Sequence, residues 1–147
     1  MDLHTLIENA IAWAFKSVER ADYPFKCLAF VEDAYEFGNR IGMFGSDCAA
    51  ESARRYAPLL AGAPTRGAFA FYRAEGQQGG VWRDWGHVGL ALGNGQVIHS
   101  WNRIRTDDYL ALQTLTPAPG WMAPIYLGWV PPEIFLAEAV WRPQASA

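Results

Sequence analysis

The segment from Trp85 to Trp101 constrains the fold more than any other stretch, because it predicts a β-hairpin that carries two of the three histidines of the chain. Gly93, Asn94 and Gly95 are residues that adopt positive φ readily, as hairpin loops require. Apolar and polar residues alternate on both sides of this loop, which is typical of half-buried strands. The length of the loop therefore decides which side chains share a face.

The register of this hairpin determines whether its two histidines can form a site. A three-residue loop pairs Leu92 with Gln96 and places His87 opposite Trp101. His87 and His99 are then diagonal neighbours on one face, roughly 7–8 Å apart between their backbones. A two-residue loop would place the two histidines on opposite faces. We predict the three-residue loop, because only that register brings the histidines together.

The composition indicates a single globular domain over residues 1–147, with 51% hydrophobic residues and enough chain for a sizeable core. The net charge of −3 and the absence of a basic run argue against nucleic acid as a partner. The sequence contains no stretch of about 18 apolar residues, so we expect no membrane span. The N-terminus lacks a basic signal-peptide region, and Glu8 interrupts the apolar segment that follows. We therefore expect a cytoplasmic protein, or one exported without a cleaved signal.

The two cysteines, Cys27 and Cys48, are too few for a disulfide framework. No Cys-x-x-Cys is present, so we expect no structural metal site and no cofactor. Cys27 follows Lys26 at a predicted helix start, where unpaired N–H groups and the helix dipole favour an anion. This position predicts a lowered pKa and more thiolate. The alternative is an ordinary buried small residue. Cys48 also lies at a predicted helix start and is the rival nucleophile.

The remaining elements place helices first and strands second, which favours an α+β fold with an antiparallel sheet. The predicted helices cover residues 6–19, 27–37, 49–56 and 133–140, and the further strands cover 67–73 and 125–130, with 75–80 as a loop. Local end signals support these boundaries. They are Thr5 with Glu8 as a capping box, Gly38 as a helix stop, Ser46 or Asp47 as a cap, and Asp107 or Asp108 as the cap of a short turn through Leu112.

Four sequence blocks occur in a specific order: Cys27-Leu-Ala-Phe-Val, Gly67-Ala-Phe-Ala-Phe-Tyr, Gly86-His-Val-Gly-Leu and Val97-Ile-His99-Ser. Together they resemble the NlpC-like family of papain-fold cysteine peptidases. The resemblance implies a papain-like α+β fold in which N-terminal helices pack on an antiparallel sheet. It also implies that Cys27 is the nucleophile, because the family places it before the long helix and Cys48 falls in a connector.

The three matched residues have the chemistry for covalent catalysis. Cys27 attacks a carbonyl as thiolate. His87 takes the proton and returns it to the leaving amine. His99 holds the His87 ring in the useful tautomer. Three polar residues near in sequence could replace His99, namely Asp84, Ser100 and Asn102.

The residues around the nucleophile depart from the family pattern Asp-Cys-Ser-Gly. Lys26 replaces the acid and Leu28 replaces the serine, two residues that help recognise cell-wall peptides in that family, and Ala29 replaces the glycine. The resemblance implies cleavage of a peptidoglycan stem peptide beside a γ-linked D-glutamate, and these departures predict poor cleavage of an ordinary free-amine muropeptide. The substrate-binding residues that we predict are Lys26, Trp85, Trp101 and Tyr72, although aromatic residues commonly serve in packing.

Other functions fit part of the pattern. One is a thiol amidase, deamidase or acyltransferase that acts on another small amide. A second is a non-catalytic binding module on the same fold, which the joint presence of the cysteine and both histidines disfavours. A third is a metal-binding protein that uses Cys27, His87 and His99 as three ligands with an open position.

Overall fold

The computed structural model describes residues 2–43 and 45–141, so that Met1, Phe44 and residues 142–147 of the predicted domain lie outside the described residues. The helices are α1 Leu3–Lys16, α2 Cys27–Asn39, α3 Ala49–Arg55 and α4 Pro132–Phe135, with the 3₁₀ turns η1 Ala111–Thr114 and η2 Leu136–Glu138. The strands are β1 Ile41–Gly42, β2 Phe69–Arg73, β3 Glu75–Gln78, β4 Val81–Asp84, β5 His87–Ala91, β6 Gln96–Ser100, β7 Ile104–Asp108, β8 Ile125–Val130 and β9 Val140–Trp141.

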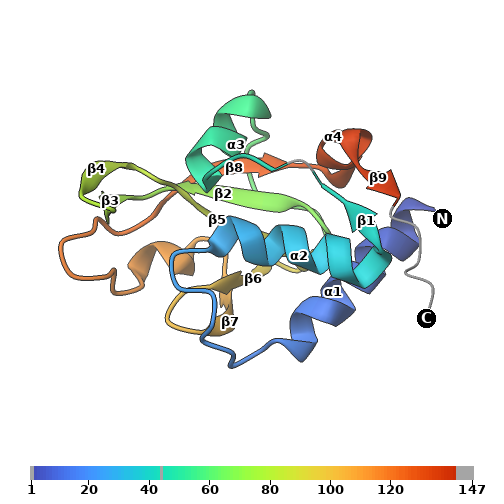
Figure 1. Ribbon diagram of the computed structural model, residues 1–147, viewed down its shortest axis with the longest axis horizontal. Helices are drawn as coiled ribbons and strands as arrows, with labels where there is room; N and C mark the ends of the chain where they lie inside the picture. The colour runs from blue at the N-terminus through green and yellow to red at the C-terminus, as the bar shows by residue number, and fades with distance from the viewer. Residues whose placement is uncertain (1, 44, 142–147) are drawn as a thin grey trace.

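A five-stranded sheet of order β7-β6-β5-β2-β8 forms the centre of the fold, and all its neighbouring strands are antiparallel. Helix α2 lies across this sheet and α1 packs against α2 (Figure 1). Two small sheets, β1–β9 and β3–β4, flank it. The predicted α+β fold is therefore confirmed. Among the described residues, no helix has the length and apolar character needed to traverse a bilayer.

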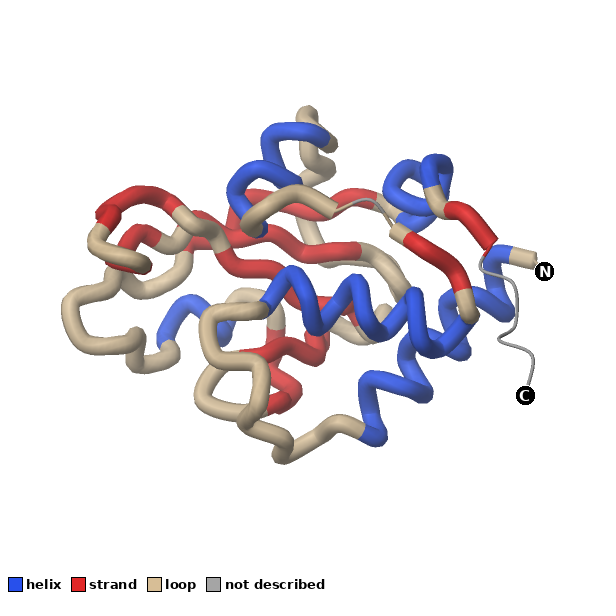
Figure 2. Tube along the Cα trace, viewed as in Figure 1, coloured by secondary structure: helices blue, strands red, loops and turns tan. Residues whose placement is uncertain are grey.

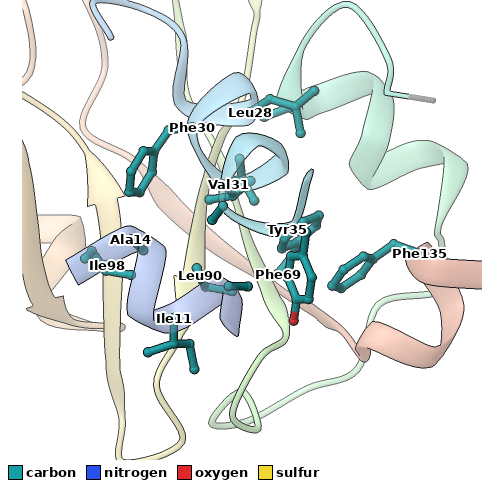
Figure 3. Close-up of a cluster of buried hydrophobic side chains, with 14 of the residues drawn as sticks. Ile11, Ala14, Leu28, Phe30, Val31, Tyr35, Phe69, Leu90, Ile98 and Phe135 are labelled. Carbon is teal, nitrogen blue, oxygen red and sulfur yellow. The ribbon is translucent and has the colours of Figure 1, made fainter. Parts of the chain in front are cut away.

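The sheet has a core on each face. The larger one packs the apolar stripes of α1 and α2 against β2, β5 and β6 (Figure 3). It includes Phe30, Val31 and Tyr35 from α2 with Leu90 and Ile98 from the sheet. The smaller core lies on the opposite face and is made of small and aromatic residues with the segment around η1. Its buried members are Ala68, Ala70, Tyr72, Ala91, Val97 and Leu112.

The first two helices form as predicted, with different ends. Helix α1 begins three residues early because the carboxylate of Asp2 accepts the N–H of Thr5 at 2.8 Å, so Asp2 rather than Thr5 is the cap. Gly38 does not stop α2. A Cβ there would lie 2.7 Å from the carbonyl oxygen of Asn9, so this glycine lets the two helices approach. The helix continues to Asn39 and is capped by Arg40, which takes a left-handed φ of 57°.

Several short elements differ from the prediction. The expected loop 75–80 contains β3 and the turn of the β3–β4 hairpin, in which the apolar residues Val81 and Trp82 are adjacent and exposed, so no periodic apolar pattern marks the strands. Strands β1, β7 and β9 were not predicted either. Cys48, and neither Ser46 nor Asp47, is the cap residue of α3. Asp108 caps the turn before η1, since its carboxylate accepts the N–H groups of Leu110 and Ala111. The expected terminal helix is split between α4 and η2.

The β5–β6 hairpin has the predicted register. Leu90 pairs with Ile98, and the N–H of Leu92 donates to the carbonyl of Gln96 at 2.9 Å. Gly93 and Gly95 have φ values of 89° and 84°, which allow the three-residue loop. At the other end of these strands, long loops gather around the beginning of α2 (Figure 2).

Candidate active site

Three polar side chains step diagonally across three neighbouring strands. Nε2 of His87 on β5 lies 2.9 Å from Nδ1 of His99 on β6. Nε2 of His99 lies 2.7 Å from Oδ2 of Asp107 on β7. Arg105 then holds the same carboxylate with two contacts, Nε to Oδ2 at 2.9 Å and Nη2 to Oδ1 at 3.1 Å. The result is a continuous hydrogen-bonded series that begins at His87 and ends at an ion pair.

The carboxylate at the end of this series determines which ring nitrogens carry protons. Asp107 only accepts when ionised, so Nε2 of His99 is the donor to it. Nδ1 of neutral His99 is then an acceptor, and Nε2–H of His87 donates to it. The remaining ring nitrogen of His87, Nδ1, therefore carries a lone pair and is the basic atom of the series.

Burial keeps both rings neutral. His87 is 4% exposed and His99 is 0% exposed. Burial, and then the nearby His99, hold the pKa of His87 well below its usual value. Burial also lowers the pKa of His99, although Asp107 opposes the shift. Burial would raise the pKa of Asp107, but its hydrogen bonds to His99 and Arg105 outweigh this, and its pKa is lowered.

Cys27 reaches the same end of the sheet from the side of the helices. It is the first residue of α2, which packs against β5 and β6. The pairs that join β5 to β6, Leu90–Ile98 and Ala91–Val97, lie close to their loop. The two strands are therefore no longer paired at His87. At this open end the backbone N–H of Val88 acts on the Cys27 thiol. Cys27 and His87 line one cleft.

The thiol itself differs from the sequence-based expectation of a lowered pKa. Burial raises the pKa of Cys27 to about 11, outweighing the N–H groups of Val88, Leu28 and Cys27, which favour the thiolate. The helix start alone predicted the opposite direction because it gives no information on burial. Burial therefore favours the neutral form of the Cys27 thiol and of the His87 imidazole alike.

A tight turn fixes the start of β5 and hence the backbone of His87. Oδ1 of Asp84 accepts the N–H groups of Ala74 and Gly86 at 3.0 and 2.9 Å. Gly86 has a φ of 75°, and a Cβ there would lie 2.5 Å from the backbone nitrogen of Ala50 on α3. The backbone approaches so closely that only glycine fits without a shift of α3 or of the strand.

The cleft has a volume of about 490 Å³ and contains most of the predicted substrate-binding residues. Lys26, Trp85 and Trp101 line it. The Trp101 ring stands edge-on to His87 with centroids 5.1 Å apart, and its Nε1–H donates to the carbonyl of Thr116. The Trp85 Nε1–H donates to the carbonyl of Gly76 at 3.0 Å. Both tryptophans are thus fixed by backbone carbonyls and present ring surface to the cleft.

Tyr72 does not line this cleft. It is 1% exposed, its hydroxyl donates to the carbonyl of Tyr109 at 2.7 Å, and its ring packs behind His87 with centroids 5.9 Å apart. Its place is in the smaller core, where burial raises its pKa. The prediction that it binds substrate is therefore not supported by its position.

The alternatives to His99 have other partners. Asp84 holds the turn before β5. Ser100 donates to the carbonyl of Tyr23 at 2.9 Å and ties β6 to the loop before α2. Asn102 accepts from Arg105 at 3.3 Å. His99, in contrast, contacts His87 directly, with Nδ1 of His99 2.9 Å from Nε2 of His87.

Cys48 lines the same cleft as Cys27, and the side chain of a cation contacts its sulfur. Nη2 of Arg83 lies 3.5 Å from its sulfur. Within the part of the chain that the structure describes, no group of three or more His, Cys, Asp or Glu side chains is placed to hold a metal ion. The two histidines bond each other, which leaves neither facing nitrogen free for a shared ion.

Comparison with solved structures identifies a similar fold. NlpC1 from Trichomonas vaginalis superposes with a TM-score of 0.52 and 18% sequence identity, over 89% of this chain. The present chain is thus NlpC-like in fold. It spans 47% of the length of that protein's chain. No protein-family model matches the sequence, and no curated protein is similar to it in sequence.

Sequence reasoning missed the two residues that complete the hydrogen-bonded series, Asp107 and Arg105. Asp107 was considered only as a helix cap. Arg105 and Asp107 alternate along the chain with Ile104 and Thr106. The strand signal is weak because Ile104 is apolar and buried but Thr106 is polar. A third strand after the hairpin would have placed Asp107 diagonal to His99, as His99 is to His87.

Proposed function

We propose that this protein is a papain-like thiol hydrolase of amide bonds and a member of the NlpC-like family. In this proposal Cys27 is the nucleophile, His87 is the general base, and His99 and Asp107 position the base. The observation that carries the proposal is the hydrogen-bonded series from His87 through His99 to Asp107. It leaves a lone pair on Nδ1 of His87, in a cleft that Cys27 also lines.

The proposed reaction begins from the neutral pair. The Cys27 sulfur attacks the amide carbonyl while its proton moves to Nδ1 of His87. The imidazolium is stabilised through His99 by the Asp107 carboxylate. Backbone N–H groups at the start of α2 are available to the oxyanion, since the first helical bond runs from Phe30 to Lys26 and leaves the earlier donors without helical acceptors.

The second half of the proposed reaction restores the enzyme. His87 gives its proton to the leaving amine as the C–N bond breaks, which leaves an acyl thioester on Cys27. A water molecule, deprotonated by His87, then attacks the thioester carbonyl. The C–S bond breaks, the sulfur regains the proton, and the carboxylic acid product leaves.

The substrate class that the family resemblance implies is a peptidoglycan stem peptide, cut beside a γ-linked D-glutamate. The partner is then a small peptide or another small amide, without nucleic acid. The cleft is large enough for such a ligand, and Lys26, Trp85 and Trp101 line it. The cellular compartment is also part of the proposal, because the protein must be located where this substrate occurs.

Digestion of purified muropeptides, with products identified by mass, tests this function. We expect a new amine and a new carboxylate at one amide bond, with no product from Cys27→Ala. Cys48→Ala is the matched control, because it removes the other thiol of the same cleft, and it should keep at least half of the activity. Equal turnover by wild type and Cys27→Ala would overturn the proposal, as would loss of activity in Cys48→Ala alone.

A further inference from the structure

Two aromatic rings outside the catalytic residues form a wall of the cleft beside the nucleophile. Phe25, in the loop before α2, stacks on Trp121, in the loop before β8, with ring centroids 5.4 Å apart and an interplanar angle of 30°. Both rings line the cleft, together with Met122. Phe25 is 61% exposed and Met122 is 37% exposed. Large apolar side chains at the mouth of a cleft mark a surface that a ligand can cover.

The backbone holds this pair in place at a conformational cost. Phe25 has a φ of 56°, a left-handed conformation that is rare for a bulky residue. The N–H of the next residue, Lys26, donates to the carbonyl of Tyr23 and closes the turn. A strained residue two positions before a candidate nucleophile indicates that its orientation is part of the site.

The indole ring of Trp121 packs directly against the backbone of Gly76. A Cβ at Gly76 would collide with the indole ring of Trp121, so only glycine allows this approach. The adjacent N–H of Met122 donates to the carbonyl of Glu75 at 2.9 Å and anchors the loop to β3. The carbonyl of Gly76 also receives the Nε1–H of Trp85. One glycine thus fixes two tryptophans of the cleft relative to each other.

We propose that Phe25 and Trp121 form a subsite for an aromatic or branched apolar group that a small amide substrate, or a modified stem peptide, carries next to its scissile carbonyl. The distance along the chain sets this position. Phe25 is two residues from Cys27, so their Cα atoms lie at most about 7.6 Å apart. A group that stacks on Phe25 is therefore within a few bonds of the carbonyl that the sulfur attacks. The proposal rests on the proposed function, since it assigns substrate chemistry to the same cleft.

A pair of alkylating agents tests the subsite without requiring hydrolysis. Iodoacetamide and N-phenyliodoacetamide carry the same electrophilic carbon, and the thiol sulfur displaces iodide from it in both. The rate at Cys27 is measured by peptide mapping, and the ratio of the two rates is divided by the ratio for glutathione at the same pH. We expect a preference for the phenyl compound of roughly three- to tenfold, the range of a good aromatic contact.

Three variants locate the preference. Phe25→Ala, Trp121→Ala and Gly76→Ala should each bring the ratio to within twofold of glutathione. Phe37→Ala is the matched control, because Phe37 is also an exposed phenylalanine, 59% accessible, but packs on Trp13 away from the cleft. It should keep the wild-type ratio. Cys48 provides an internal control in the same digests, and its rates should change by less than twofold.

The outcomes separate the two proposals. A wild-type ratio equal to that of glutathione, or a ratio unchanged in both Phe25→Ala and Trp121→Ala, overturns the subsite even if muropeptides are cleaved. A strong phenyl preference in a protein that cleaves no amide supports the subsite and overturns the proposed hydrolase.

Discussion

His99 contacts His87 through one nitrogen and Asp107 through the other, at 2.9 and 2.7 Å. This arrangement makes the two-histidine pair asymmetric. Without the carboxylate, either ring could donate to the other, and Nδ1 of His87 could carry a proton in place of the lone pair. Asp107 removes this ambiguity through its contact with His99. The site therefore depends on a residue that does not line the cleft.

Asp107→Asn should lower kcat/KM by on the order of 10²-fold with little change in KM, because the amide can also donate to His99 and stabilise the wrong tautomer. The pH profile distinguishes positioning from a structural role, since the acidic limb should shift when the carboxylate charge is lost. Asp108→Asn is the matched control. It removes the adjacent negative charge but keeps a side-chain oxygen that caps the turn before η1, so stability should change by less than about 1 kcal/mol and activity by less than twofold.

Alkylation of Cys27 should follow its raised pKa. In a Cys48→Ala background, the rate with iodoacetamide should continue to increase with pH past 9, because the folded thiol titrates near 11. A thiolate–imidazolium pair would instead give a plateau near neutral pH. A plateau below pH 8 would contradict the neutral resting pair and restore the expectation from the helix start alone.

The hairpin and the start of α2 could be predicted from sequence because both depend on local signals. Gly93 and Gly95 fix the loop length, and the loop length fixes the face of both histidines. The helix stop at Gly38 was wrong for a physical reason. Its role is a close approach to Asn9 on α1, and a contact between distant residues leaves no local pattern.

The rest of the site depends on tertiary structure. Asp107 reaches His99 only because β7 pairs with β6, and β7 is too polar to be recognised as a strand. The raised pKa of Cys27 depends on how deeply α2 settles on the sheet, which no cap signal reports. The aromatic wall likewise joins two loops that lie about a hundred residues apart in the sequence, too far for any local pattern to predict.

Gly86→Ala should disrupt the site by displacing the backbone that positions His87. The new Cβ would meet Ala50 at 2.5 Å in a backbone conformation of positive φ, and the start of β5 or α3 must move. We expect a loss of about 2–4 kcal/mol in the free energy of unfolding and at least tenfold in kcat/KM. Gly79→Ala provides the control, since it has a φ of 57° but nothing within 4 Å. It should cost about 1 kcal/mol and leave activity unchanged.

Stability should depend on pH through the buried histidines. The folded pKa of His87 lies below its unfolded value, so its neutral form contributes stability that is complete above about pH 6.5 and is lost as the pH falls through the folded pKa. The slope is at most about 1.4 kcal/mol per pH unit for one histidine. Glu32 acts in the opposite direction, because burial raises its pKa to about 7 and its contribution is lost as the pH rises from 4.5.

The difference between wild type and His87→Gln isolates the histidine contribution. The stability advantage of wild type should decrease as the pH is lowered from 7 to 5 in urea titrations, and Glu32→Gln should change the slope in the opposite sense. A constant difference between wild type and His87→Gln over this range would mean that His87 titrates normally in the folded protein.

The charge at Lys26 should determine the response to a free amine in the substrate. Lys26 is the cap residue of α2, is exposed, lines the cleft and makes no capping hydrogen bond with its side chain. A site that binds an ammonium group through an acid at this position would lose that pair in the present chain, and because position 26 is exposed the loss is about 0.2–1 kcal/mol, or up to about fivefold in affinity. We expect muropeptides with an acylated N-terminal amine to be cleaved faster than those with a free amine. Lys26→Asp should reverse the order, because it supplies both a helix cap and a partner for the ammonium group.

Turnover of the two muropeptides by wild type, Lys26→Asp and the Cys27→Ala blank measures this, with Lys16→Asp as a control for the charge change at the far end of α1. Cys27-dependent cleavage of the free-amine muropeptide by wild type at a rate equal to that of the acylated one would contradict the role given to Lys26.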